Sequence, residues 1–180
     1  MRSLSLALLV VAAGFPGFSQ KFSPENLAPS IPTPSSVVDR MLEAGRVKAG
    51  DIVYDLGSGD GRIVIAAAQK YGAKAVGVEM LPDLCRQAQR RIRELGLSDR
   101  ASIVEGNVFH VDFSAATVVT MYFMTDSNER LRPNLEKYLK PGTRVVSNQF
   151  PIKGWKPVTV ERGKSPVDYT IYVYEVGRTK

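Results

Sequence analysis

The sequence predicts an α/β fold in which helices cover both faces of a mostly parallel sheet. Three observations lead to this prediction. Short apolar strand candidates alternate with helical segments, a glycine-rich turn at residues 57–61 follows the first strand candidate, and the chain ends in two strand candidates with no helix between them. Strand–helix–strand units form parallel sheets with right-handed crossovers. We therefore expect a three-layer α/β/α sandwich of Rossmann-like type, closed by an antiparallel C-terminal hairpin.

Each element follows from its own residue pattern. Apolar residues at helical spacing over 37–42, ended by Gly45, predict a first helix with Thr33 as its N-cap and Pro34 at its first position. The predicted buried strands are 52–54, 75–78, 102–104, 117–123 and 143–147, and the helices between them are 61–71, 82–95 and a segment around 131–139. The final strand candidates, 156–161 and 168–176, flank a turn sequence, which predicts the hairpin.

Composition and charge narrow the class of protein. The chain has 180 residues, 44% hydrophobic and 23% charged, which is typical of one globular domain rather than a disordered tail, a collagen-like fibre or a polytopic membrane protein. One cysteine (Cys85) excludes an internal disulfide, and one histidine (His110) excludes a zinc cluster, so we expect no metal. The formal charge of +6 favours an anionic partner without naming it.

Residues 1–19 have the three-part layout of a secretory signal. Arg2 precedes an apolar run over 4–13, and small residues stand at Gly17 and Ser19, where a signal peptidase would read them. The run is shorter than the roughly 20 residues of a membrane span. We expect cleavage after Ser19 and an exported or membrane-associated protein. An uncleaved anchor, an organellar presequence and a misassigned start codon, which would make the protein cytoplasmic, are the alternatives.

The turn after the first strand candidate carries the chemistry. Residues 55–61, Asp-Leu-Gly-Ser-Gly-Asp-Gly, combine three glycines, which let a ligand approach the backbone closely, with the acids Asp55 and Asp60. Dinucleotide folds have a glycine-rich turn in the same place, but with G-x-G-x-x-G spacing, and these two carboxylates would repel a diphosphate. They would attract a sulfonium and an α-ammonium group. The turn therefore indicates S-adenosylmethionine rather than NAD.

Two further strand ends place polar groups at the same edge of the sheet, where such folds bind ligands. Glu79 ends the second strand, so its carboxylate can accept both hydroxyls of a ribose. Asn107 follows the third strand and is placed to meet an adenine edge. The alternative is that Asp55 caps a helix and Glu79 is a solvated strand end, but the three features together favour cofactor binding.

These residues resemble the class I S-adenosylmethionine-dependent methyltransferases over about residues 31–180. Within that superfamily, the chain resembles a small branch of protein-lysine methyltransferases that act on the mitochondrial ATP synthase c-subunit and the adenine nucleotide translocator, and more distantly on histone H3. The matching segments are residues 31–34, the DLGSGDGR turn at 55–62, residues 116–133, and residues 139–147 followed by Phe150 and Trp155. The resemblance implies a lead-in at 20–33 and a methyltransferase domain at 34–180.

The resemblance also implies a set of cofactor-binding residues. The turn would hold the methionine half, the acid after the second strand the ribose, the residues after the third strand the adenine, and the segment at 32–34 would cover the cofactor. These residues are Pro32, Thr33, Asp55, Gly57, Ser58, Gly59, Gly61, Glu79, Met80, Asn107 and Val108. Asn107 replaces the usual aspartate, so we expect weaker cofactor binding rather than its loss.

The acceptor is expected at the end of the strand over 117–123. Methyl transfer depends on holding the nucleophile against the sulfonium methyl, and a dry aromatic channel helps a lysine lose its proton. We predict Tyr122 and Asn128 as catalytic residues, with a packed core role as the alternative for Tyr122. Asn148 and Gln149 are further candidates for orienting the substrate, and His110 is expected to face solvent rather than to act as a base.

The expected activity is protein-lysine N-methylation, with a small-molecule methyltransferase or an exported cofactor-binding module as alternatives. Residues 122–125 lack the Asn/Asp-Pro-Pro-aromatic motif that grips a flipped base, so no nucleic-acid partner is expected. Arginines 86, 90, 91 and 93 are expected to form a solvated helix face. Because no segment is long enough for a lid, a protein substrate is favoured over a small molecule. We expect a monomer, with membrane proximity through residues 1–19.

Overall fold

The computed structural model describes residues 31–164 and 167–179. The predicted signal, residues 1–19, and residues 20–30 of the predicted lead-in lie outside the described residues. The strands are β1 (Ile52–Leu56), β2 (Lys74–Glu79), β3 (Ala101–Glu105), β4 (Val118–Met121), β5 (Arg144–Asn148), β6 (Thr159–Gly163) and β7 (Tyr169–Glu175). The helices are α1 (Ser35–Ala44), α2 (Arg62–Tyr71), α3 (Pro82–Glu94) and α4 (Thr125–Tyr138).

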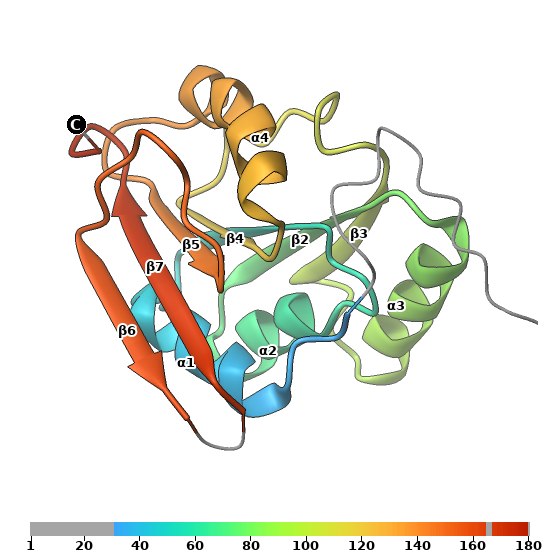
Figure 1. The fold of residues 1–180 in the computed structure, drawn as a ribbon. Helices are drawn as coiled ribbons and strands as arrows, with labels where there is room; N and C mark the ends of the chain where they lie inside the picture. Colours follow the sequence, from blue (N-terminus) through green and yellow to red (C-terminus); the bar gives the residue numbers. More distant parts are fainter. Residues whose placement is uncertain (1–30, 165–166, 180) are drawn as a thin grey trace, which may run out of the picture.

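The strands form one sheet in the order β3-β2-β1-β4-β5-β7-β6. The first five of these are parallel, and β7 lies antiparallel between β5 and β6. Helices α1, α2 and α3 cover one face and α4 covers the other (Figure 1). The predicted three-layer sandwich with an antiparallel C-terminal hairpin is therefore confirmed.

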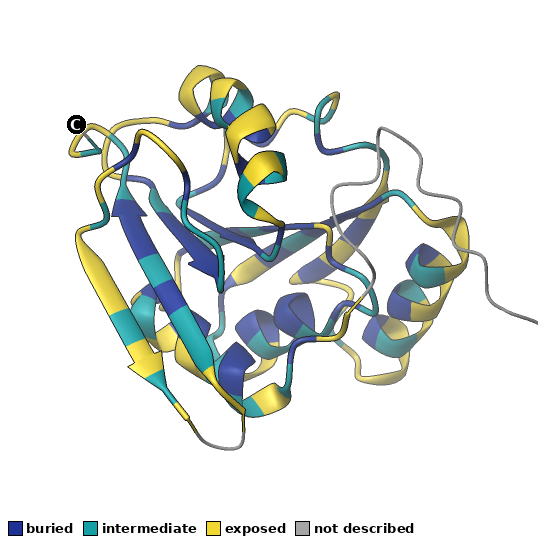
Figure 2. Cartoon of the chain, in the orientation of Figure 1, coloured by how far each residue is buried: buried dark blue, intermediate teal, exposed yellow. Residues whose placement is uncertain are grey.

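Two hydrophobic clusters separate the layers. The first joins α1, α2 and α3 to one face of the sheet, with Met41 and Ala67 among its buried members. The second packs α4 and the loop before β6 against the other face, with Leu131 and Tyr174 at its centre. Figure 2 shows the consequence: the central strands β4 and β5 are largely buried, whereas the edge strand β6 is mostly exposed. No helix among the described residues is long and apolar enough to cross a membrane.

Several element boundaries differ from the sequence predictions; the largest difference is at α4, which begins at Thr125 rather than near residue 131. Three others are as follows. Helix α1 has Pro34 rather than Thr33 at its N-cap, without a side-chain hydrogen bond. Strand β4 ends at Met121, because the chain leaves the ladder there and Phe123 packs its ring against the glycine turn. Strand β6 begins at Thr159 rather than at residue 156, because Trp155 turns into the second cluster against Tyr174, with ring centroids 5.7 Å apart.

Candidate functional site

The five parallel strands, β1 to β5, have their carboxyl ends at the same end of the sheet. The glycine turn lies at this end, which we call the cofactor edge. Gly57, Gly59 and Gly61 adopt φ values of 77°, 54° and 77°, in the left-handed region that favours glycine. A Cβ atom at Gly57 would lie 2.7 Å from the Phe123 ring, whereas one at Gly59 would meet no atom within 4 Å. The turn is therefore closed on the strand side at Gly57 and open at Gly59.

Asp55 lies beneath this turn and is only 3% exposed. Thr120 Oγ1 donates a hydrogen bond of 2.7 Å to Asp55 Oδ1 from the neighbouring strand. Burial raises the pKa of Asp55 to about 7, against the lowering effect of the Thr120 hydrogen bond and with further raising by the charges of Glu79 and Asp60. A cation bound above the turn would favour the ionised carboxylate.

Glu79 is buried, and its carboxylate accepts hydrogen bonds from the glycine turn and from the backbone after β2. It is therefore not a solvated strand end. Its Oε2 accepts a hydrogen bond of 2.8 Å from the Gly59 amide. Its Oε1 accepts from the Met80 and Leu81 amides at 2.9 and 2.8 Å. Because a carboxylate has about four lone-pair sites, Glu79 can hold the turn in place and still accept hydroxyl donors.

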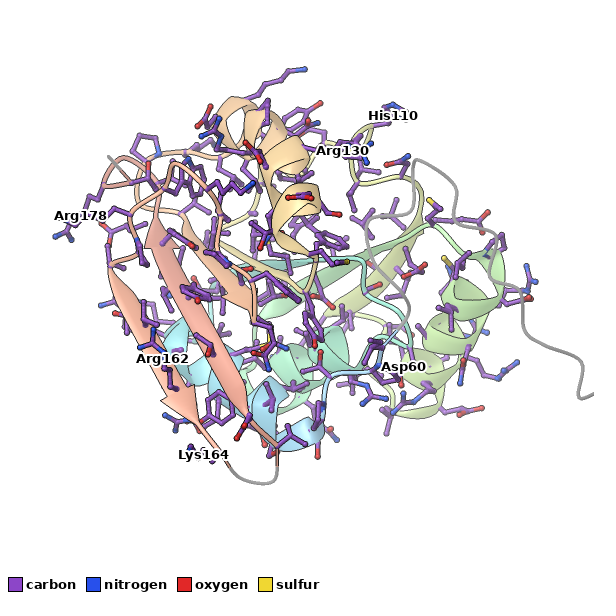
Figure 3. All side chains as sticks on the ribbon, in the orientation of Figure 1. Asp60, His110, Arg130, Arg162, Lys164 and Arg178 are labelled. Atoms are coloured by element: carbon purple, nitrogen blue, oxygen red, sulfur yellow. The ribbon has the colours of Figure 1, made fainter. Side chains whose placement is uncertain are left out.

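The Asp60 carboxylate is paired with two arginines, so it is not free to attract a cationic cofactor. This corrects the prediction that Asp55 and Asp60 both do so. Its carboxylate accepts hydrogen bonds from Arg62 Nε at 2.9 Å and Arg62 Nη2 at 2.8 Å, and from Arg91 Nη1 at 3.0 Å. The Arg62 contacts hold the pKa of Asp60 below its ordinary value. Figure 3 shows the labelled Asp60 beside α3, which carries Arg91. The predicted solvated face is therefore corrected for Arg91, which is half-buried and paired with Asp60, whereas the other three arginines of α3 are exposed.

Arg62 also ties the segment before α1 to the turn. Its Nη1 donates a hydrogen bond of 2.7 Å to the Thr33 carbonyl oxygen. Thr33 is buried and Pro32 is exposed. The predicted covering segment thus contacts the same turn as Asp55 and Glu79, through a residue that sequence reasoning left out. Nearby, Ser58 Oγ is buried without a hydrogen-bond partner.

The predicted adenine side lies after β3. Asn107 Oδ1 accepts a hydrogen bond of 3.0 Å from the Phe109 amide, so the amide oxygen is already used within its own turn. Val108 is buried in the second hydrophobic cluster. The structure therefore gives the two residues different surroundings, with Asn107 half-buried at the loop and Val108 in the core.

The two residues predicted to be catalytic lie near the ends of β4 and β5. Tyr122 is half-buried and stacks on Phe150, with ring centroids 6.2 Å apart and ring planes inclined at 25°. Asn128 is fully buried in α4, and its Nδ2 donates to the carbonyl oxygens of Phe150 and Pro151 at 3.1 and 3.2 Å. Asn128 thus fixes the loop that carries the aromatic partner of Tyr122.

Other candidates lie outside this cluster. His110 is exposed on the loop after β3, as labelled in Figure 3. In the described part of the chain, no three His, Cys, Asp or Glu side chains come together as a metal site would require.

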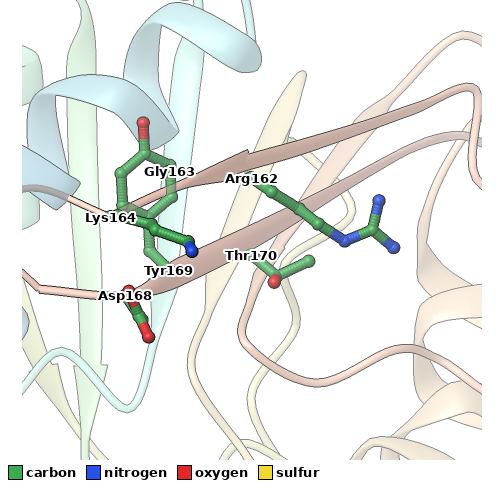
Figure 4. A pocket seen from close by; sticks show the side chains of 6 residues that line it. All are labelled: Arg162, Gly163, Lys164, Asp168, Tyr169 and Thr170. Carbon is green, nitrogen blue, oxygen red and sulfur yellow. The ribbon is translucent and has the colours of Figure 1, made fainter.

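At the tip of the β6–β7 hairpin, a cavity of about 280 Å³ is lined by Arg162, Gly163, Lys164, Asp168, Tyr169 and Thr170. Figure 4 shows the Arg162 guanidinium extending away from Lys164 and Asp168, on the side of Thr170.

The comparisons with known proteins decide which family this site belongs to. A family model described as the ANTKMT methyltransferase domain matches residues 55–159, from the buried acid of the turn to the start of β6. The chain belongs to the ANTKMT methyltransferase family. It is therefore a methyltransferase, and the family resemblance predicted from the sequence is confirmed.

Individual relatives support the same assignment. The chain is 53% identical over 156 residues to a protein-lysine N-methyltransferase of Saccharolobus islandicus, covering 84% of this chain and 96% of that protein. It is 35% identical over 129 residues to the lysine N-methyltransferase of the ATP synthase c-subunit from mouse. That match covers 72% of this chain but only 51% of the mouse protein, so the chain spans about half of that relative's length.

A solved structure identifies the cofactor. The crystal structure of a protein from Salinibacter ruber, described as an RNA methyltransferase in complex with S-adenosyl-L-homocysteine, superimposes with a TM-score of 0.78 at 44% identity. The match covers 81% of this chain and 94% of that one. S-adenosylmethionine is the cofactor of the methyltransferase. The turn suits it, because the open space at Gly59 leaves room for an amino-acid moiety and the buried carboxyl of Asp55 lies beneath it.

Proposed function

We propose that this methyltransferase transfers the methyl group of S-adenosylmethionine to the ε-amine of lysine residues in proteins. The strongest support is the Saccharolobus relative, which is named a protein-lysine N-methyltransferase and matches over 96% of its length at 53% identity. The geometry agrees, because the Tyr122–Phe150 aromatic pair lies where a lysine side chain would reach the glycine turn.

The residues divide the work between two sides of the site. We assign Asp55 and the glycine turn to the methionine half of the cofactor, Glu79 to the ribose, and Asn107 and Val108 to the adenine side. The cofactor supplies an electrophilic methyl group on a sulfonium. Tyr122 and Phe150 exclude water from the lysine side chain, which lowers the pKa of the amine and favours the neutral nucleophile. Positioning of the amine provides most of the rate.

RNA methylation is the second candidate function, because the Salinibacter structure is described as an RNA methyltransferase. Two features of this chain favour protein instead. The residues after β4, Tyr122-Phe123-Met124-Thr125, lack the motif that grips a flipped base. Among the arginines of α3, Arg86 pairs with Asp83 and Arg91 with Asp60, so part of the basic helix face is already neutralised.

One labelling experiment separates these functions. The purified protein is incubated with tritium-labelled S-adenosylmethionine and an extract of its source organism. The reaction is then divided into protease-treated, ribonuclease-treated and ultrafiltered portions. We expect label that resists ribonuclease, is removed by protease, and is recovered as methylated lysine after acid hydrolysis. Asp55→Ala serves as the inactive control. Label that only ribonuclease removes would establish the RNA alternative, and label only in the filtrate would establish a small-molecule acceptor.

We further propose that the protein is a monomer that residues 1–19 bring to or across a membrane. The proposed location rests on the signal-like layout of the sequence alone. The N-terminus of the mature protein, determined by mass spectrometry after cell fractionation, tests the location. Gel filtration with light scattering tests the oligomeric state. An intact Met1 in the cytoplasmic fraction would contradict the proposed location.

A further inference from the structure

Asn148 is the last residue of β5, and its side-chain oxygen Oδ1 is buried without a hydrogen-bond donor. The residue is only 2% exposed, and its Oδ1 has no hydrogen-bond partner. A buried polar group without a partner loses its hydration without gaining a hydrogen bond in return. Native proteins keep few such groups, and each one requires an explanation. A ligand donor that arrives during catalysis is such an explanation.

The strand register places Asn148 on the cofactor side of the sheet. Side chains alternate along a strand, and Val146 belongs to the cluster with α1 and α2, so Asn148 faces that side as well. Ser147 faces α4, where its Oγ lies 3.3 Å from Asn128 Nδ2. Asn148 therefore shares its face with Asp55 and Thr120, whose side chains are hydrogen-bonded across β1 and β4.

The strand pairing places Asn148 close in the fold to the predicted acceptor channel. Met121 and Ser147 form the last pair of the β4–β5 ladder; Tyr122 directly follows Met121 where the chain leaves the ladder, and Asn148 directly follows Ser147. Asn148 thus lies at the edge where the strands end, one strand beyond Thr120 and two beyond Asp55. An amine that passed along Tyr122 toward the glycine turn would come next to the Asn148 amide.

The backbone after Asn148 is held in an unusual conformation that fixes the end of β5. Gln149 has φ 63°, in the left-handed region that non-glycine residues rarely adopt. Its amide donates to the Thr170 carbonyl oxygen and its Nε2 to the Asp168 carbonyl oxygen, both at 2.7 Å. Such strain persists only where surrounding contacts impose it, and it concentrates at functional sites. Asn148 is thereby a preorganised group rather than a mobile one.

We propose that Asn148 Oδ1 accepts a hydrogen bond from the ε-amine of the acceptor lysine and directs its lone pair toward the sulfonium methyl. The inference rests on the proposed lysine methylation. The nitrogen lone pair forms the new N–C bond, the C–S bond breaks, and its electron pair stays on sulfur, which leaves S-adenosylhomocysteine. The methylated ammonium then releases one proton to water.

This geometry makes Asn148 sensitive to the methylation state of its substrate. A neutral lysine amine has two N–H donors, a monomethylated amine has one, and a dimethylated amine has none. The Asn148 hydrogen bond can therefore assist the first and second transfers but not the third. A residue with a purely structural role would affect all three transfers alike, so the ratio of their rates distinguishes the two roles.

The test compares Asn148→Leu with the wild-type enzyme on two acceptor mixtures, using tritium-labelled S-adenosylmethionine. One mixture is an extract of the source organism, and the other is the same extract after exhaustive reductive dimethylation of its lysines. Hydrolysates are separated into mono-, di- and trimethyl-lysine. On the first mixture, we expect Asn148→Leu to form mono- and dimethyl-lysine at least tenfold more slowly than the wild-type enzyme. The rate of trimethyl-lysine formation on the second should change less than twofold.

Controls keep the result decisive. Gln89→Ala removes an amide side chain of α3 that donates to the Ile103 carbonyl oxygen, and it should leave both rates unchanged. Calorimetric affinity for S-adenosylhomocysteine should be the same in wild type and Asn148→Leu. If Asn148→Leu does not fold, Asn148→Ala removes the same acceptor without added bulk and is subject to the same ratio test.

Equal losses on both mixtures, or no loss on either, would overturn the inference while leaving lysine methylation intact. If the wild-type enzyme itself forms no methyl-lysine on either mixture, the proposed function fails, and the role of Asn148 fails with it.

Discussion

Thr120 Oγ1 lies 2.7 Å from Asp55 Oδ1, so the acid at the base of the glycine turn receives its hydrogen bond from the next strand of the sheet. Burial nevertheless raises the pKa of Asp55 to about 7. The acid therefore changes charge in the physiological range of pH, directly beneath the turn assigned to the cationic methionine half of the cofactor. Both cofactor binding and stability should respond.

Cofactor affinity should fall as the pH falls through 7. Protonated Asp55 offers no charge to an ammonium or sulfonium group, so at pH 6, one unit below this pKa, binding of S-adenosylmethionine should be roughly tenfold weaker than at pH 8. Calorimetric titrations between pH 5.5 and 8.5 measure this dependence. Asp55→Asn should bind weakly at every pH. A wild-type affinity that stays constant over this range would mean that Asp55 is not the group that meets the cation.

The stability of the cofactor-free protein should depend on pH in the opposite direction to cofactor affinity. The pKa of Asp55 is higher in the folded state than the ordinary value of 3.8, so between about pH 4 and pH 7 the folded state holds a proton that the unfolded state has released. The Asp55 contribution therefore makes the free energy of unfolding decrease as the pH rises across this window, and it levels off above pH 7. The difference in melting temperature between Asp55→Asn and wild type should accordingly grow from pH 4 to pH 7. A constant difference would contradict the raised pKa.

Gly59 and Gly142 provide a matched pair of glycine substitutions. Both residues have positive φ values, 54° and 88°, and a Cβ atom at either would meet no protein atom within 4 Å. Each Gly→Ala change should therefore destabilise the fold by a similar amount, about 1 kcal/mol, because alanine is strained in this conformation. Only Gly59→Ala places a methyl group in the open part of the cofactor turn.

We expect Gly59→Ala to abolish measurable binding of S-adenosylhomocysteine, whereas Gly142→Ala retains wild-type affinity. Thermal unfolding verifies that the two variants are equally stable, and calorimetry measures the binding. Equal affinities would show that the cofactor does not lie against Gly59.

Arg62 should matter for cofactor binding although it carries the wrong charge to bind a cation. It holds Asp60 through two hydrogen bonds and the Thr33 carbonyl through a third. Arg62→Ala removes all three contacts, which frees the covering segment and leaves Asp60 with Arg91 and the backbone amide of residue 62. We expect roughly tenfold weaker binding of S-adenosylhomocysteine, about 1.4 kcal/mol, by calorimetry. Arg90→Ala, on the exposed side of α3, should have no effect, and an equal loss in that variant would indicate general charge rather than a positioning contact.

The sequence allowed much of this site to be predicted, because its main features are local. A glycine turn directly after an apolar strand and an acid at the end of the next strand define the cofactor edge without any knowledge of distant contacts. The pairing of Asp60 with Arg62 is local as well, and sequence reasoning missed it. Only the second partner, Arg91, lies 31 positions away on another helix. The face of Asn148 likewise depends on strand pairing, and the buried position of Asn128 depends on how α4 crosses the sheet. Spacing along the chain does not specify either of them.

Asn128 should support the acceptor side without contributing to cofactor binding. Its Nδ2 donates to the Phe150 and Pro151 carbonyl oxygens, and it is fully buried, so Asn128→Ala leaves the Pro151 oxygen without this donor and the Phe150 oxygen with only Ser147 Oγ. We expect a loss of stability of about 1–3 kcal/mol, measured by urea unfolding. Because Phe150 then loses its fixed position against Tyr122, the KM for the protein acceptor should rise at least fivefold. The affinity for S-adenosylhomocysteine should be unchanged. Asn134→Ala controls for general damage to α4, because it removes a side-chain amide further along this helix that donates to the Phe109 carbonyl oxygen. If Asn128→Ala lowers kcat without raising KM, Asn128 acts on the transfer step itself, as the sequence predicted, rather than through the loop.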